Sequence, residues 1–84
     1  MNEIEVIFGK VIRFFREKQS HSQEAFAEMA GVHRTYISSI ELGKVQISIV
    51  VADRLATALE IPLSKIWKEV ERRQANPESS PADH

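Results

Sequence analysis

Four side chains that can form hydrogen bonds fall close together in the middle of the chain: Arg34, Thr35, Ser38 and Ser39. In an α-helix, positions i, i+1, i+4 and i+5 share one face. The guanidinium of the Arg can donate two parallel hydrogen bonds, and each hydroxyl can both donate and accept. This face therefore has the chemistry to recognise another polar surface by direct hydrogen bonds.

Local helix stability does not explain this choice of residues. An exposed helical face is usually filled with Lys and Glu, which favour the helix more strongly than Ser and Thr do. Reading base edges in the major groove of DNA is one purpose that favours short hydroxyl side chains beside an Arg, since Arg can bind a guanine through two hydrogen bonds. The alternative is that Arg34 is an ordinary solvated surface residue, which is the more common situation on composition alone.

The residues around this face predict two short helices joined by a tight turn. Ser22 is a natural N-cap for a helix over QEAFAEMA, and Glu24 in the first turn suits the helix dipole. Gly31 is well placed to end that helix in the left-handed conformation. The next helix is expected from about Arg34 to Leu42. Two short helices joined by a three- to four-residue turn that contains Gly form a helix-turn-helix.

Apolar spacing predicts three further helices and no strand. The segment from about Asn2 to Lys18 repeats apolar residues at steps of three and four, which is typical of an amphipathic helix. Ser48 is the expected N-cap of a helix over about Ile49–Leu59. Pro62 suits the first turn of a last helix, about Leu63–Arg73. The predicted fold class is therefore all-α, with five helices around one core.

The apolar side of each helix gives a set of expected core residues. Those in the first three helices are Phe8, Ile12, Phe15, Phe26, Ala27, Met29 or Ala30, Ile37 and Ile40. Those in the fourth helix are Ile49, Ala52, Leu55, Ala56 and Leu59. Because Ala27 is small, it suits the point where the two short helices must cross.

Length and composition limit the classes of protein to which the chain can belong. Its 84 residues suffice for one domain, expected at residues 1–73, and the polar, Pro- and Ser-rich segment 74–84 is predicted to be a disordered tail. The absence of Cys excludes a disulfide framework, a thiolate metal site and a Cys nucleophile. No apolar run reaches the roughly 18 residues of a membrane span, and no signal peptide is visible. These features favour a cytoplasmic protein.

No set of residues predicts catalysis or a bound cofactor. His21, His33 and His84 lack the spacing of metal ligands, and no nucleophile, base and orienting group come together in the sequence. The net charge of −1 favours neither nucleic acid nor membrane. Residues 10–44, however, hold six basic and four acidic side chains, so a small positive excess covers the helix-turn-helix.

The stretch SQEAFAEMAGVHRTYISSIELGK, residues 22–44, resembles the helix-turn-helix of the Cro and phage-repressor type, the XRE family. The spacing, the positions of Gly and Ala, and the Ile-x-x-Ile-Glu pattern agree together. Sequence on both sides extends the resemblance over roughly Phe8–Val70. Within the family, RTYISSIE in a chain of this size is similar to the controller proteins of restriction–modification systems. The departures from the family pattern are His21, His33, Ile47 and Glu60.

The resemblance implies a role for each matching residue. Contacts with DNA bases are implied for Arg34, Thr35, Ser38 and Ser39. Contacts with the DNA backbone are implied for Gln23, His33, Tyr36 and Lys44, with packing inside the fold as the equal alternative for Tyr36. Arg16 and Glu41 match a buried ion pair that ties the first helix to the third.

Apolar side chains in the C-terminal half indicate that a second copy of the chain is a partner. Helix-turn-helix proteins usually pair and bind half-sites about 10 base pairs apart. Val50 and Val51 are apolar where the family is usually polar, and the last helix has an apolar stripe of its own. The residues expected in the dimer interface are Ile61, Leu63, Ile66, Trp67 and Val70. The alternative for Trp67 is packing over Phe14 and the first helix.

Together these features predict a sequence-specific transcriptional regulator that binds an inverted-repeat operator in double-stranded DNA as a homodimer. We expect no catalysis, cofactor, metal, small-molecule ligand or membrane partner. A controller protein would regulate its own gene and a nuclease gene. The alternative from another class is an antitoxin-like protein-interaction module that neutralises a partner enzyme. The near-neutral charge and the surplus of apolar side chains fit that alternative as well.

Overall fold

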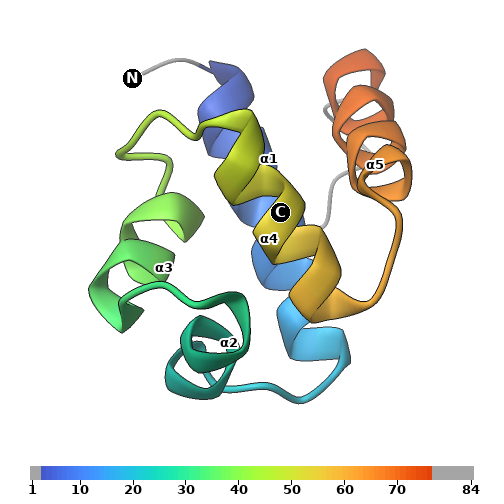
Figure 1. Ribbon diagram of the computed structural model, residues 1–84. Coiled ribbons are helices and arrows are strands. Elements are labelled where there is room, and N and C mark those ends of the chain that lie inside the picture. Colours follow the sequence, from blue (N-terminus) through green and yellow to red (C-terminus); the bar gives the residue numbers. More distant parts are fainter. Residues whose placement is uncertain (1–2, 77–84) are drawn as a thin grey trace.

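The computed structural model describes residues 3–76 as five packed helices (Figure 1). The helices are α1 (Glu3–Lys18), α2 (Gln23–Ala30), α3 (Arg34–Glu41), α4 (Ile49–Leu59) and α5 (Leu63–Ala75). No strand occurs between residues 3 and 76, and the predicted all-α fold with five helices is confirmed. In Figure 1, α2 and α3 lie to one side of α1 and α4, and α5 lies to the other.

Helix α5 extends further than the sequence predicted. Gln74 and Ala75 are helical, although they belong to the segment expected as a tail. Just before them, Arg73 is buried, donates a hydrogen bond to Glu69 at 2.8 Å and stands over the ring of Phe14. These contacts support the last turn, which explains why the helix continues past its apolar stripe. Asn76 follows as the C-cap of the helix, and residues 77–84 of the predicted tail lie outside the described residues.

Helix ends follow the local signals in the sequence. The hydroxyl oxygens of Ser22 and Ser48 each accept a hydrogen bond from the backbone N–H three residues later, at 3.0 and 3.1 Å. Gly31 ends α2 in the left-handed conformation, with φ 71°. Glu60 takes the same conformation at the end of α4, with φ 57°, where the family usually has Gly. The departure at Glu60 therefore does not change the path of the chain.

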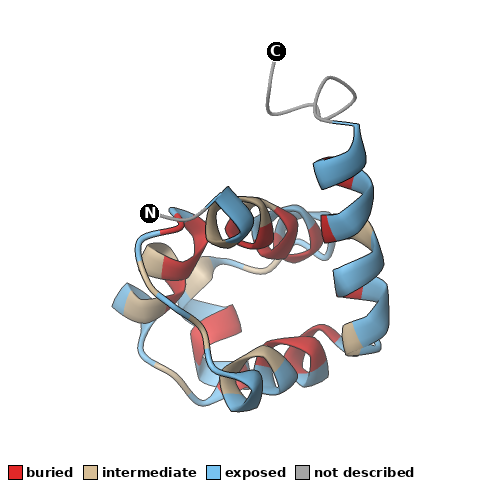
Figure 2. Cartoon of the chain, turned by 90° about the horizontal axis from the view of Figure 1, so that it is seen from above, coloured by how far each residue is buried: buried red, intermediate tan, exposed pale blue. Residues whose placement is uncertain are grey.

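One core holds the five helices together, and buried positions face the interior in Figure 2. Its largest fully buried side chains are Phe26, Ile12, Ile37, Ile40, Leu55, Leu59, Ile66, Val11 and Val70. Of the alternatives Met29 and Ala30, Ala30 takes the inward position at the end of α2, and Met29 is 46% exposed. One core prediction is wrong: Ile49 is 82% exposed, because the side of α4 that meets the core begins later, at Val51 and Ala52.

Helices α1 and α3 pack closely against each other at Gly9. A Cβ atom at this position would overlap the carbonyl oxygen of Ile40 and would lie 2.9 Å from the carbonyl oxygen of Glu41. Only a residue without a side chain fits between these backbones. Sequence reasoning did not single out Gly9, because a Gly inside a helical pattern looks like a weak helix former rather than a contact.

Replacement of Gly9 by alanine is expected to lower the free energy of unfolding by about 3 kcal/mol, the upper end for overpacking, because the obstructing atoms belong to the backbone. The matched control is Gly31→Ala, where an added Cβ meets nothing within 4 Å and only the left-handed φ is strained. That control should lose about 1 kcal/mol. Urea unfolding followed by circular dichroism measures both. A Gly9→Ala protein as stable as wild type would contradict the close crossing.

Two guanidinium groups hold the carboxylate of Glu69 on α5. Arg72 donates to it at 2.6 Å and Arg73 at 2.8 Å. The hydrogen bonds from Arg72 and then Arg73 lower the pKa of Glu69 from the ordinary 4.5 to about 2. The side chain of Glu69 is 20% exposed, whereas that of Arg72 is 47% exposed, so solvent screens part of the interaction.

Glu69 is expected to stabilise the fold by about 1 kcal/mol at neutral pH. Because its pKa is lower in the folded chain than in the unfolded chain, this stabilisation is complete above the unfolded value of 4.5 and is lost as the pH falls to about 2. The stability difference between wild type and Glu69→Gln should therefore shrink over that range. Urea midpoints between neutral and acid pH measure it. A difference that does not vary with pH would point to packing rather than charge.

Candidate nucleic-acid interface

The turn between α2 and α3 sets the orientation of α3. Its Gly31 adopts φ 71°, and the N–H of Val32 donates to the carbonyl of Ala27 at 3.0 Å. Phe26 and Ile37 are fully buried on either side of the turn. The two helices therefore meet the core through one side each, and the opposite side of α3 is left to solvent.

A buried ion pair joins α1 to the end of α3. Nε of Arg16 donates to Oε2 of Glu41 at 2.6 Å and Nη2 to Oε1 at 3.0 Å, with the two side chains 10% and 4% exposed. The hydrogen bond with Glu41 raises the pKa of Arg16 above its usual value. Arg16 also donates to the carbonyl of His21 at 2.8 Å. The pair implied by the resemblance thus fixes α1, α3 and the loop before α2.

Gln23, in the first turn of α2, is part of the same network. Its Nε2 donates to Oε1 of Glu41 at 3.0 Å, and the residue is half-buried. Sequence reasoning gave Gln23 a phosphate contact and missed this bond. An amide nitrogen has two N–H groups, so one remains for a contact at the surface. The bond to Glu41 orients the amide and so determines where the second N–H can point.

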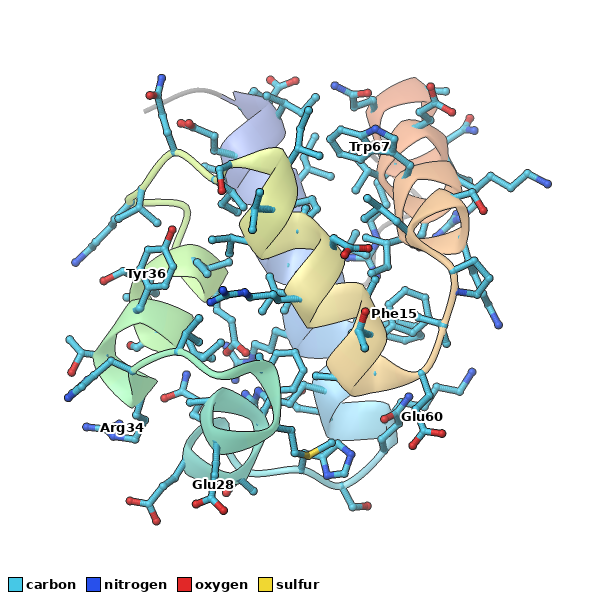
Figure 3. All side chains as sticks on the ribbon, viewed as in Figure 1. Phe15, Glu28, Arg34, Tyr36, Glu60 and Trp67 are labelled. Carbon is cyan, nitrogen blue, oxygen red and sulfur yellow. The ribbon has the colours of Figure 1, made fainter. Side chains whose placement is uncertain are left out.

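The outer side of α3 carries the residues predicted to contact bases. Arg34 and Thr35, in the first turn, are exposed, whereas Ser38 and Ser39, one turn later, are half-buried. In Figure 3, Arg34 lies at the free edge of α3, away from α1 and α5. The first turn is therefore more accessible than the second, and Arg34 and Thr35 are the best placed of the four to reach another molecule.

The residues predicted to contact a backbone border this side of α3. Lys44 is exposed directly after the helix, and its own N–H donates to the carbonyl of Ser39 at 3.0 Å. Tyr36 is half-buried and packs against the core, so its ring is used for packing while part of it is accessible. His33 caps α3, because its Nδ1 accepts the N–H of Thr35 at 3.2 Å. The departure at His33 therefore preserves the start of the helix.

The five predicted dimer residues differ in how far they are buried. Ile66 and Val70 are fully buried, so their assignment to an interface between chains is wrong. They lie four residues apart on α5 and both face the core of their own chain. Ile61 and Leu63 are half-buried and pack against that core. Trp67 is 45% exposed and is the most accessible of the five.

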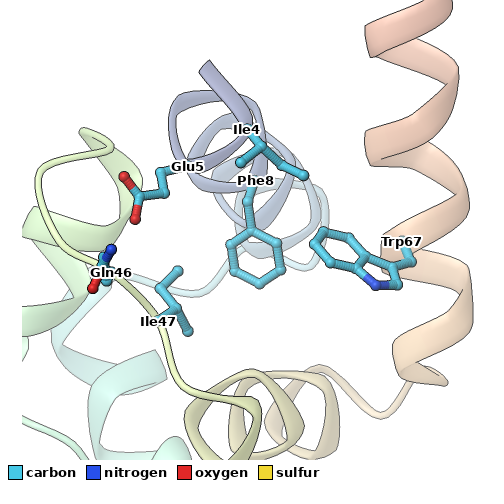
Figure 4. Close-up of a pocket in the computed structure, with 6 residues that line it drawn as sticks. All are labelled: Ile4, Glu5, Phe8, Gln46, Ile47 and Trp67. Atoms are coloured by element: carbon cyan, nitrogen blue, oxygen red, sulfur yellow. The ribbon is translucent and has the colours of Figure 1, made fainter. Parts of the chain in front are cut away.

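Trp67 borders a groove of about 310 Å³ between α1, the α3–α4 loop and α5 (Figure 4). Its ring packs edge-on against Phe8 of α1, with centroids 5.6 Å apart. The alternative is therefore right about the first helix, but the aromatic partner there is Phe8 rather than Phe14. The residues that line the groove are Ile4, Glu5, Phe8, Gln46, Ile47 and Trp67. Shortly after Ile47 in the chain, Ile49 and Val50 are 82% and 63% exposed. Exposed apolar side chains thus gather around the start of α4 and the groove.

Neither a metal-binding cluster nor a membrane-spanning helix occurs in the part of the chain that the structure describes. No three His, Asp or Glu side chains between residues 3 and 76 gather in a way that can hold a metal ion. None of the five described helices is both long enough and apolar enough to cross a membrane.

Known proteins resemble this chain along most of its length. Residues 12–66 match the helix-turn-helix family. The control protein C.MunI of Mycoplasma sp. is 40% identical over 73 residues, which cover 86% of this chain and 99% of that protein. The solved structure of the restriction-modification controller protein C.AhdI from Aeromonas hydrophila is 36% identical, with a TM-score of 0.71 over 73% of this chain and 92% of its own. The clp gene regulator ClgR from Corynebacterium glutamicum, 22% identical, shares the fold, with a TM-score of 0.84 over 88% of this chain and 79% of its own.

Proposed function

This chain belongs to the XRE-type helix-turn-helix family, and from that premise we propose that it is a transcriptional regulator that reads double-stranded DNA through α3. The observation that carries the proposal is the exposed first turn of α3, held in place by the buried Arg16–Glu41 pair. In a helix-turn-helix the second helix enters the major groove, and its N-terminal residues contact the base edges. Arg34 and Thr35 are exposed at that end of α3.

Each polar residue around α3 has a contact that suits its chemistry. In our proposal, Arg34 binds the O6 and N7 atoms of a guanine, and Thr35 contacts a neighbouring base. Ser38 and Ser39 are half-buried, so each contacts only a DNA atom that comes close to the helix. That atom belongs to a base edge or to a phosphate. Lys44 and the accessible part of Tyr36 meet phosphates, as does the second amide N–H of Gln23.

We propose that two copies pair through the exposed apolar surface around the groove. This surface comprises Ile49, Val50 and Trp67, with Leu63 one turn before the Trp. Ile66 and Val70 are not part of the proposed interface, because they are buried in the core of their own chain. In a two-fold interface the same patch is used on both subunits. The exposed side chains at the start of α4 in one copy can therefore enter the groove of the other. Exposed apolar patches of this kind mark interaction sites.

The proposed mechanism is occupancy, with no chemical step and no cofactor. A dimer bound to an inverted repeat near a promoter in the cytoplasm blocks polymerase or recruits it. C.MunI and C.AhdI are a control protein and a restriction-modification controller by name. By that likeness we propose that this chain controls its own gene and the gene of a restriction nuclease.

The test is selection from a randomised duplex library with purified protein at about 0.15 M salt. An enriched inverted repeat, with an affinity that falls steeply with salt, would support a dimeric DNA reader. The half-site spacing would give the geometry of the dimer. Sedimentation of a monomer at tens of micromolar would contradict the pairing. Weak, salt-sensitive binding without enrichment would contradict sequence reading and favour the antitoxin-like alternative.

A further inference from the structure

The N-cap of α3 differs in chemistry from the caps of α2 and α4. Those two helices begin at Ser22 and Ser48, whose hydroxyls cap in the usual way. At the start of α3, Nδ1 of His33 accepts the N–H of Thr35 at 3.2 Å. Ser, Asn and Asp are the strongest N-cap residues, and His is not among the preferred types. Capping alone therefore does not explain an imidazole at this position.

The capping bond determines which nitrogen of the ring carries the proton. A nitrogen that accepts a hydrogen bond has no proton, so a capping ring is neutral and carries its proton on Nε2. Because the ring is rigid, the Nε2–H then points away from the backbone that Nδ1 contacts. Among the hydrogen bonds of residues 3–76, the His33 side chain makes only the capping bond, and the residue is exposed. The Nε2–H is thus an oriented donor at the surface.

We propose that His33 has two simultaneous roles: it caps α3 through Nδ1 and donates an uncharged hydrogen bond through Nε2–H to a phosphate oxygen of the bound DNA. The inference rests on the proposed function, since His33 directly precedes Arg34 at the end of α3 that would enter the groove. Phosphate contacts fix the register of a protein on the duplex. Because the cap already holds the ring, the contact requires little further ordering of the side chain. His33 thereby sets the position from which Arg34 reaches its base.

Two substitutions separate the roles. His33→Ser keeps a hydroxyl cap of the kind that works at α2 and α4 but has no donor at the distance of Nε2. Its urea midpoint should be at least as high as that of wild type, because Ser is the better N-cap, while its affinity for the selected operator should fall about two- to tenfold for each half-site. His33→Ala loses both roles, so its midpoint and its affinity should both fall. A His33→Ala protein as stable as wild type would overturn the capping role.

The salt dependence tests whether the contact is uncharged. A neutral donor releases no counterion, so wild type and His33→Ser should give parallel lines of log affinity against log salt. The matched control is Lys44→Ala, which removes a charged phosphate contact and should make the slope shallower by about 1 for each subunit. A shallower slope for His33→Ser would overturn the neutral contact, because it would reveal an imidazolium.

Two further outcomes would overturn the phosphate contact of His33. Operator binding by His33→Ser equal to that of wild type would overturn the phosphate contact and leave His33 as a cap only. Failure of the wild-type protein to select any sequence would overturn the proposed function and the phosphate contact together. That failure is seen with wild type alone, so it is distinguished from failure of the role given to His33.

Discussion

Replacement of Glu41 by leucine is expected to lower the free energy of unfolding by about 3–5 kcal/mol. The substitution leaves the guanidinium of Arg16 buried, with its side chain 10% exposed and its hydrogen-bonded partner gone. The carboxylate of Glu17 remains 3.9 Å away, but it is 54% exposed and screened by solvent. The hydrogen bond to the carbonyl of His21 remains, but it does not balance the charge. Nε2 of Gln23 also loses its acceptor. The loss therefore affects α1, α2 and α3 together.

A double-mutant cycle isolates the charge pair from the packing. Arg16→Met combined with Glu41→Leu removes both charges, and a complete buried pair can often be replaced by apolar side chains at little cost. The double variant should thus be much less destabilised than the sum of the single variants, with a coupling energy of up to about 3 kcal/mol. Urea unfolding of the four proteins under one buffer condition measures the cycle.

An exposed ion pair on the same helix is the matched control. Arg13 and Glu17 form a hydrogen bond at 3.0 Å with side chains 60% and 54% exposed. Arg13→Gln should change the free energy of unfolding by less than about 1 kcal/mol, because water solvates the exposed carboxylate of Glu17 when Arg13 is removed. Arg13 is the position to change, since Glu17 also lies 3.9 Å from Arg16. If the Arg16 and Glu41 losses simply added, or if Glu41→Leu cost no more than Arg13→Gln, the pair would not be the buried tie between α1 and α3.

The starts of α2 and α4 and the end of α2 could be predicted because they depend on residues close together in the chain. Ser22 and Ser48 cap through a hydrogen bond to a backbone three residues later, and Gly31 adopts the left-handed conformation that a short turn requires. The face of α3 that bears Arg34 follows from the helical period alone. Such features need no knowledge of the packing between helices, and the structure agrees with them.

The features that sequence reasoning missed depend on contacts between helices. An apolar stripe on α5 fits its own core and a second subunit equally well, and only the packing reveals that Ile66 and Val70 face inward while Trp67 does not. Gly9 is necessary because the backbone of α3 passes beside it at Ile40 and Glu41, far along the chain. The bond from Gln23 to Glu41 likewise joins residues that the sequence separates. Local patterns carry no information about these distances.

Replacement of Arg34 by alanine is expected to have the largest effect on DNA binding. A bidentate contact between Arg and guanine is worth about 1–3 kcal/mol of discrimination, and a dimer makes it in both half-sites, so the selected operator should lose about 2–6 kcal/mol of binding free energy. Operators that already lack the guanine should lose much less. Titration of wild type and Arg34→Ala against the selected operator and its single-base variants measures this difference.

Two further substitutions separate base reading from simple charge. Arg34→Lys keeps the charge but not the planar pair of donors, so it should recover affinity for all DNA without recovering the preference for guanine. Lys44→Ala should weaken binding to every sequence by a similar factor, since a phosphate contact carries no sequence information. If Arg34→Ala also weakened all sequences equally, Arg34 would be another backbone contact. The specificity would then have to come from Thr35 and the half-buried Ser38 and Ser39, whose short side chains reach less far from α3.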